Sequence, residues 1–270
     1  MTVQPAPGDT PGDDRLATDT GTVLMLSNMH TRCDGVPVDE LPDAVRFELD
    51  QMLASQDAPP MSELSDAEFL AQMRTRLITP DTSGELSMDY ARPAFDGLVA
   101  ELRRDLPTTV QTVSDSDIEG RDVDLLFDVG QRNTDAEPAE VDSLDHEVFA
   151  LSGDSLFIAS KALNIPRLIE TVLDGVAPLG VLFSVPHRGL LFLHRVGAST
   201  VEAASWIASA TVNATDNPLG GVVSYDTYYW YGGTTQPITR VDVDAHSIAI
   251  LVGGAFEDAL NQVAELHAGN

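Results

Sequence analysis

Histidine and arginine stand side by side at His187 and Arg188, between two short apolar runs in the segment LGVLFSVPHRGLLFLHRV, residues 179–196. A turn would display both side chains. An imidazole beside a guanidinium can bind a carboxylate or a phosphate, the arginine through a bidentate fork. The pair is therefore a candidate binding site. The alternative is a solvated turn in which Arg188 pairs with one of the many acidic residues of the chain.

Two carboxylates and an imidazole recur at alternate positions, Asp242, Asp244 and His246. In a continuous strand they would point to one face and could hold a divalent metal for a metal-assisted hydrolase. The same letters, VDVDAHS, are also typical of a strand that ends in a polar turn, where Asp and Ser hydrogen-bond locally. Both interpretations stay open.

Four of the five tyrosines and one of the two tryptophans lie within residues 225–231. Large rigid rings lose little entropy on ordering and provide much of the binding energy at interfaces. We therefore expect a protein partner to bind here, through Tyr228, Tyr229, Trp230 and Tyr231. The alternative is that alternate rings fill the core of a sheet while their hydroxyls reach its edge.

Common catalytic motifs are absent from the sequence: there is no G-x-S-x-G, Walker loop, H-E-x-x-H, EF-hand loop or C-x-x-C. This disfavours a standard hydrolase or nucleotide enzyme, and no cofactor is predicted. His194 is expected to be a buried, hydrogen-bonded histidine, and Ser160 and Lys161 to point apart as adjacent helical residues. Cys33 is the only cysteine, so an intrachain disulfide is excluded.

The chain is strongly acidic, with 43 acidic and 15 basic residues and a net charge of −28. Such a charge argues against binding to nucleic acid or to an anionic membrane surface. It is typical of a salt-loving host or of a GC-rich genome. Residues 1–150 hold 32 of the acids, so the second half is expected to hide more of its surface, in a core or against a partner. With no run of 18 apolar residues and no signal pattern, we expect a soluble, cytoplasmic protein.

The apolar runs on either side of Pro186 and Gly189 predict a β-hairpin, in which Gly189 takes the left-handed conformation. Both faces of both strands are mainly apolar, which is typical of strands in the middle of a sheet covered on both sides. The second half also predicts strands at 146–151, 221–231, 238–243 and 247–252, and helices at 155–163, 167–173, 200–212 and 255–266.

The first half is predicted to be mainly helical. We expect a disordered acidic tail at 1–20, an α/β subdomain at 21–132, an acidic linker at 133–142 and a second subdomain at 143–270. In the first subdomain, strands are predicted at 22–27 and 108–113, and helices at 39–56 and 121–131. A further helix is predicted to begin at Ser65, with a capping box to Glu68, and to continue through Met73 and Leu77. Another is predicted from Pro93 to Leu102.

The segments GDSLFIASKAL, GVLFSVPHRGLLFLHRV and VSYDTYYWYGG together resemble the C-terminal part of the YtpQ-like family of uncharacterised bacterial proteins, over about residues 146–240. The sequence differs from that pattern at Gly189, where Asp is expected, and at Lys161, where Arg is usual. The family has no established activity, so the resemblance bears on the fold more than on function.

The sequence thus predicts an α+β fold, with a helical N-terminal part and a largely antiparallel sheet with flanking helices in the C-terminal half. The leading functional hypothesis is a non-catalytic module that binds a protein partner, in an accessory, chaperone-like or immunity-type role. The alternatives are an anion-binding or metal-assisted hydrolytic enzyme, and a halophilic housekeeping domain whose acidity reflects only the solvent.

Overall fold

The computed structural model describes residues 3–6, 15–18, 23–25, 33, 36–54, 58–80, 87–107, 109–215, 221–242 and 247–268. The chain divides into two compact units: Met1–Leu64 with Asp105–Gln111, and Ser65–Arg104 with Thr112–Asn270. The boundary predicted at the acidic segment 133–142 therefore falls inside the second unit, where this segment contains the end of one helix and the start of a strand.

The first unit contains a three-stranded antiparallel sheet in the order β1-β2-β3, with bounds Val3–Ala6, Arg15–Thr18 and Val23–Met25. Helix α2 (Leu41–Ala54) and the 3-10 turn η2 (Met61–Glu63) follow. The strand predicted at 22–27 and the helix predicted at 39–56 are confirmed. Strands β1 and β2 lie within the first 20 residues, where the Pro-, Gly- and Asp-rich composition predicts no regular structure.

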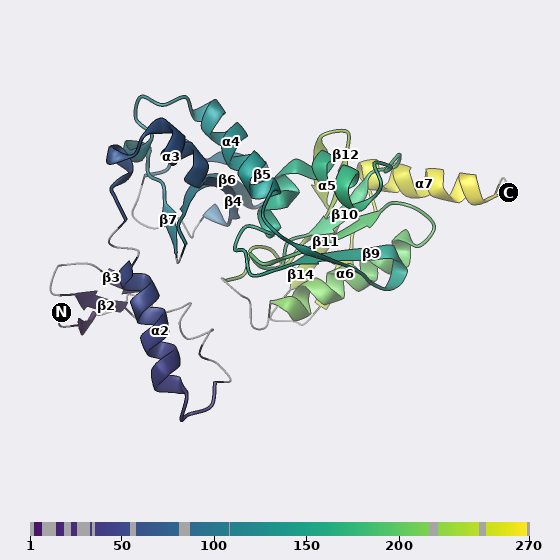
Figure 1. Ribbon diagram of the computed structural model, residues 1–270. Coiled ribbons are helices and arrows are strands. Elements are labelled where there is room, and N and C mark those ends of the chain that lie inside the picture. Colours follow the sequence, from purple (N-terminus) through teal and green to yellow (C-terminus); the bar gives the residue numbers. More distant parts are fainter. Residues whose placement is uncertain are drawn as a thin grey trace. The chain divides into compact units, whose positions relative to one another are not determined.

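A six-stranded antiparallel sheet forms the centre of the second unit; Figure 1 labels four of its strands, β9 to β12. The order across the sheet is β13-β12-β10-β11-β9-β8. Its strands are β8 (Glu140–Ser143), β9 (Val148–Ser152), β10 (Val181–Ser184), β11 (Leu190–Arg195), β12 (Thr227–Tyr231) and β13 (Thr234–Pro237). The α+β class and the largely antiparallel sheet are confirmed. Strands β10 and β11 form the predicted hairpin and occupy the middle of the sheet.

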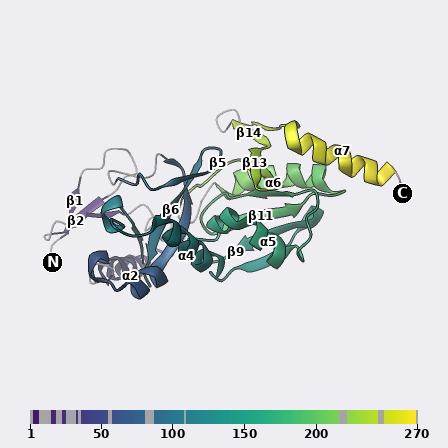
Figure 2. The same ribbon diagram turned by 90° about the horizontal axis from the view of Figure 1, so that it is seen from above.

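Helical segments cover both faces of this sheet, as the two apolar faces of the hairpin predict (Figures 1 and 2). On one face, Phe183 and Leu191 pack against η6 (Ala159–Asn164) and α5 (Ile165–Val172). On the other, Leu182 and Phe192 pack against α6 (Thr200–Ala214) and the first half of α7 (Gly254–Ala268). The connecting elements are η5 (Asp145–Glu147) and the two-stranded sheet of β14 (Thr239–Asp242) and β15 (Ser247–Ile250).

A smaller antiparallel sheet in the same unit has the order β4-β6-β5, formed by Met73–Ile78, Leu98–Asp105 and Arg92–Phe95. Strand β7 (Val110–Thr112) begins in the first unit and ends in the second. Helix α3 (Asp66–Gln72) leads into it, and the 3-10 turn η4 (Asp115–Asp117) and α4 (Val123–Asp135) follow. Helix α4 lies close on β4 at Gly130, where a Cβ atom would stand 3.3 Å from the backbone of Arg74 and Thr75.

The segment η6, which packs on the central sheet, also forms hydrogen bonds with the small sheet and with α4. Ser160 Oγ accepts a hydrogen bond from the backbone N–H of Leu77, at 3.0 Å. The ammonium group of Lys161 donates to the backbone carbonyls of Thr134, Asp135 and Glu137, at 3.1, 2.8 and 2.8 Å. These carbonyls lie at and just beyond the C-terminal end of α4, where the negative end of the helix dipole favours a cation. Lys161, the single lysine, is thus a structural residue. It bonds to the end of α4 whereas Ser160 bonds to β4, so the two adjacent side chains point apart as predicted.

Two helix predictions in the first half are wrong. The Ser65 helix starts with the predicted capping box to Glu68 but ends at Gln72, and Met73 and Leu77 belong to β4. Residues 93–102 form the β5–β6 hairpin instead of a helix. Its apolar residues also fit helical spacing, but Asp96-Gly97 makes a turn in which Gly97 has a positive φ of 75°, which breaks a helix at its centre.

Within the part of the chain that the structure describes, no helix is both long enough and apolar enough to span a membrane.

Candidate functional site

Four charged side chains gather on one face of the small sheet; we call them the arginine cluster and define it as Arg76, Glu101, Arg103 and Arg188. Arg76 on β4 and Glu101 on β6 are direct cross-strand partners, and Arg103 lies two residues further along β6. Directly paired residues and i, i+2 residues share a face of a sheet, so the register brings these three together. Arg188 comes from the tip of the β10–β11 hairpin and interacts electrostatically with the other three.

The bonding within the cluster is incomplete. Arg103 forms an ion pair with Glu101 Oε1 and donates to Thr112 Oγ1. Arg76 is only 4% exposed and Glu101 is fully buried. Among the residues that the structure describes, Arg76 Nε, Arg76 Nη2 and Glu101 Oε2 have no hydrogen-bond partner. Buried polar groups are nearly always paired, so unpartnered donors and an unpartnered acceptor on one face of a sheet indicate a place for a ligand.

The electrostatics of the cluster are dominated by burial and by like charges. Burial, with Arg188 and Arg103 nearby, lowers the pKa of Arg76 to about 8. Burial and Arg103 lower the pKa of Arg188 to about 10. Burial raises the pKa of Glu101 above its usual range, against the effect of the arginines. Three guanidinium groups against one carboxylate leave two positive charges uncompensated within the cluster, on a chain whose net charge is −28.

The hairpin tip holds Arg188 through backbone hydrogen bonds on both sides. The turn closes with Leu190 N–H donating to His187 O at 3.1 Å, and Ala159 N–H from η6 donates to Arg188 O at 3.0 Å. On the other side, Val223 N–H donates to Pro186 O at 2.8 Å. Arg188 and His187 are half-buried, so the tip is not a freely solvated turn. Gly189 is not in the left-handed conformation predicted for it.

His187 adds a neutral donor beside the cluster. Its Nδ1 accepts a hydrogen bond from Gly189 N–H at 3.3 Å, which places the ring proton on Nε2. Burial lowers the pKa of His187, which favours the same neutral form. The predicted His187–Arg188 pair therefore contributes one cation and one neutral N–H donor.

The aromatic segment is largely a core element. Tyr228 and Tyr229 are 1% and 2% exposed, and their hydroxyls donate to Asp96 O at 3.1 Å and Leu179 O at 2.8 Å. Burial raises the pKa of each tyrosine to about 12. The prediction that these two rings contact a partner is wrong, because neither can reach one in the folded protein. Trp230 is half-buried and Tyr231 is 51% exposed, so a role for them in partner binding stays a prediction.

The metal prediction cannot be followed to a site. Asp242 ends β14, whereas Asp244 and His246 lie outside the described residues. Within the described ranges, no three His, Cys, Asp or Glu side chains come together as a metal-binding group.

His194, expected to be a buried histidine, is one. Its ring contacts Glu147 O and Thr200 Oγ1, each at 3.1 Å.

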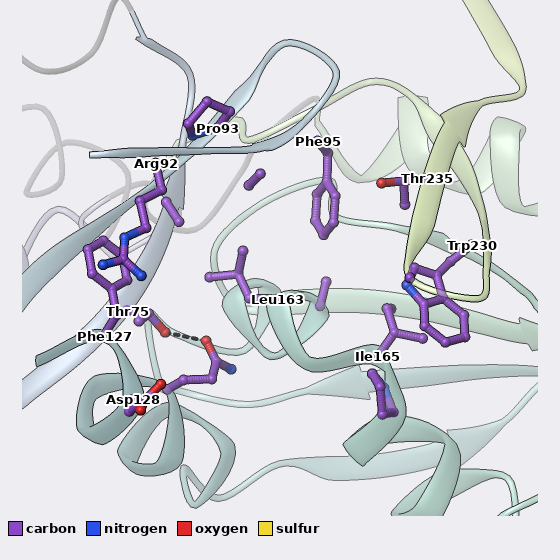
Figure 3. A pocket seen from close by; sticks show the side chains of 16 residues that line it. Thr75, Arg92, Pro93, Phe95, Phe127, Asp128, Leu163, Ile165, Trp230 and Thr235 are labelled. Carbon is purple, nitrogen blue, oxygen red and sulfur yellow. Dashed lines mark hydrogen bonds between the residues drawn. The ribbon is translucent and has the colours of Figure 1, made fainter. Parts of the chain in front are cut away.

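A cleft of about 380 Å³ lies on the opposite face of the small sheet (Figure 3). Thr75 and Ala100, the sequence neighbours of Arg76 and Glu101, line it. Trp230 and Thr235 stand at one end and Arg92 at the other. Two of its polar side chains have partners within the protein: Thr75 donates to Gln131 at 2.6 Å, and Arg92 pairs with Asp124 and stacks on Phe127. Among the described residues, the buried polar atoms without a hydrogen-bond partner include those of the arginine cluster and none from the lining of the cleft, so the cluster is the stronger candidate.

Sequence reasoning found Arg188 but missed Arg76, Glu101 and Arg103. The sequence feature that could have revealed them is the presence of charged residues within otherwise apolar strands, β4 (MRTRLI) and β6 (LVAELRRD). Chemically, the cluster offers guanidinium donors and excess positive charge, which is the environment that binds carboxylate or phosphate oxygens.

The fold and the site define an α+β protein with a buried cationic cluster between a sheet face and a hairpin tip. Comparisons with models of protein families, with curated proteins and with solved structures found no match.

Proposed function

We propose that this protein is a binding module that takes an anionic ligand at the arginine cluster. The observation that carries the proposal is Arg76, a buried arginine with two nitrogens that have no partner among the described residues. It shares its site with two further arginines and a single carboxylate. A bound oxyanion would accept hydrogen bonds from these nitrogens and would neutralise positive charge that the one carboxylate of the cluster leaves uncompensated.

Energetics support a ligand here. An arginine keeps its proton at neutral pH, so burying Arg76 beside Arg103 and Arg188 places like charges together in a medium of low dielectric constant. A buried charge is costly unless it is paired and hydrogen-bonded. Such a cost is retained at binding sites, where the ligand supplies the missing partner.

Other functions stay predictions. Binding of a protein partner now depends on Trp230, Tyr231 and the hairpin tip, and an acidic or phosphorylated partner could present its anion to the cluster. Metal-assisted hydrolysis depends on Asp244 and His246, which lie outside the described residues.

Thermal unfolding and calorimetry test the proposal. The full chain is titrated with sodium phosphate, sodium sulfate or sodium acetate, with sodium chloride added to hold the ionic strength constant. A ligand that binds only the folded state stabilises it by about 2.7 kcal/mol at 100 times Kd, so the melting temperature should rise and saturate with at least one of these anions.

Two arginine variants provide the comparison. Arg188→Gln removes a cluster charge and should abolish the saturable rise, whereas Arg167→Gln removes an exposed arginine of α5 that pairs with Glu170 and should leave the rise intact. If wild type shows no saturable binding of any of the three anions, or if both variants respond alike, the proposal is wrong.

A further inference from the structure

The chemistry of the cluster also selects among anions, an inference that rests on the proposed function and deepens it. Within the cluster, three guanidinium groups and one carboxylate give a net charge of two positive units, and His187 adds none because its Nδ1 is an acceptor. A carboxylate ligand would leave one buried positive charge uncompensated. A dianion would compensate both, so the charge balance favours a doubly charged oxyanion.

Glu101 adds a second requirement. Its Oε1 is occupied by Arg103, and its Oε2 is fully buried without a hydrogen-bond partner among the described residues. An ionised carboxylate oxygen is only an acceptor, so it needs a donor. A ligand oxygen that carries no proton would face it as one acceptor against another, which leaves both without a bond and costs binding free energy.

We infer that the ligand is hydrogen phosphate, a dianion that keeps one proton and donates it to Glu101 Oε2. Its other oxygens accept from Arg188 and from Arg76 Nε and Nη2, which have no partner among the described residues. Sulfate has the same charge and tetrahedral shape at neutral pH but has no proton to donate. The site should therefore distinguish hydrogen phosphate from sulfate by one hydrogen bond, in which the proton of the ligand lies between a phosphate oxygen and Glu101 Oε2.

The ligand proton also separates two sources of phosphate. Inorganic hydrogen phosphate has both the double charge and the hydroxyl, whereas the dianion of a phosphate monoester has lost its hydroxyl. Methyl phosphate serves as the probe for the monoester class. If the phosphate belongs to a larger phosphorylated molecule, methyl phosphate should bind at least as tightly as inorganic phosphate.

The test is a calorimetric titration of the full chain at pH 7.5 and constant ionic strength with inorganic phosphate, methyl phosphate and sulfate. Wild type should bind inorganic phosphate about 10-fold or more tightly than either of the others, because an unpaired buried acceptor costs a factor of that order. In Glu101→Gln the amide can donate to an unprotonated oxygen, so sulfate should bind at least as tightly as phosphate. Glu63→Gln, on η2, is the matched control and should keep the wild-type preference.

The outcomes separate the two proposals. Equal affinities for phosphate and sulfate in wild type would overturn the inference while anion binding stands, since Glu101 would then carry its own proton. Tighter binding of methyl phosphate would also overturn it, in favour of a phosphorylated molecule. Absence of binding by these three anions would overturn the inference, and absence of binding by acetate as well would overturn the proposed function itself. The wild-type affinity ratio alone decides the inference if Glu101→Gln does not fold.

Discussion

Arg76 is the residue at which binding and stability oppose each other. Its charge is buried beside two like charges, and its Nε and Nη2 have no partner among the described residues. Replacement by methionine removes the charge and keeps much of the side-chain volume. Replacing a buried ion pair by hydrophobic residues is often neutral or stabilising, whereas removing one member of a pair is costly. Among the described residues Glu101 is paired with Arg103 and not with Arg76, so Arg76→Met breaks no ion pair. We expect Arg76→Met to raise the free energy of unfolding by about 1–2 kcal/mol in chloride buffer, measured by urea denaturation, and to abolish anion binding.

The comparison for this prediction is Arg74→Met on the same strand. Arg74 forms an ion pair with Glu137 at 2.7 Å, so its loss should destabilise the protein. Destabilisation by both variants would show that Arg76 makes a net favourable contribution in the free protein and would contradict the strain argued for it.

His194 predicts a pH dependence of stability. Its neutral ring donates from Nδ1 to Glu147 O and accepts at Nε2 from the Thr200 hydroxyl, and burial lowers its pKa. The unfolded chain takes up this proton near pH 6.5, before the folded protein does. Below about pH 6.5 the unfolded state binds more protons, so the stability due to the neutral ring, present above that pH, is lost as pH falls towards the folded pKa.

The measurement compares His194→Gln with wild type by urea denaturation at pH 7.5 and 5.5. At pH 7.5 the variant should be less stable by about 1–3 kcal/mol, because it leaves buried partners unsatisfied. At pH 5.5 the difference in the free energy of unfolding between the variant and wild type should be smaller. The exposed His267→Gln serves as the control, and a difference for His194→Gln that is the same at both pH values would contradict the argument.

Among the elements, the β10–β12 pairing depends on Gly180. This glycine precedes β10 with a φ of +86°, and a Cβ atom there would lie 2.4 Å from Trp230 O and 2.9 Å from Tyr229 Cε2. Alanine would meet both backbone strain and a clash that the paired strand cannot relieve. We expect Gly180→Ala to destabilise the protein by about 2–4 kcal/mol in urea denaturation.

Gly197→Ala is the matched control for Gly180. It lies just beyond β11, its φ is not in the left-handed range, and its Cβ would meet only Arg195 O at an ordinary 3.8 Å. Gly197→Ala should change the free energy of unfolding by less than about 1 kcal/mol. Equal effects at the two positions would show that Gly180 is not held as closely as its contacts indicate.

Local signals account for the elements that sequence predicts well. The capping box at Ser65 and Glu68 acts within four residues and is found as expected. For the hairpin around Pro186, the turn residues and the apolar residues of both faces all lie within 18 consecutive residues, 179–196. Residues 93–102 fail because helical spacing and strand pairing fit the same apolar positions, and only pairing with β4 across the sheet decides between them.

The candidate site is harder to predict because it is non-local. Arg76 and Glu101 are 25 positions apart and become neighbours through the β4–β6 register, while Arg188 arrives from another sheet. A histidine and an arginine in a turn were visible in the sequence, but the residues that give them a site were not. The tyrosines show the opposite error, since composition alone does not tell a core strand from a binding surface.

For the molecule as a whole, the net charge of −28 predicts a dependence on salt. Like charges repel in the compact state, and added salt shortens the distance over which they act from about 10 Å at 0.1 M to about 3 Å at 1 M. We expect the midpoint of urea denaturation to rise between 0.1 and 1 M sodium chloride. Urea is required because it is uncharged, and potassium chloride should give the same rise at equal ionic strength if screening is the cause.

The size of that rise separates the explanations of the acidity. A protein that is folded in dilute buffer and gains modestly from salt carries its acids as a consequence of composition, and its arginine cluster can be studied at low salt. A chain that folds only near molar salt would support the halophilic interpretation, and anion binding would then have to be measured against molar chloride. No change in midpoint would mean that the acids are compensated locally, and would contradict the repulsion on which the prediction rests.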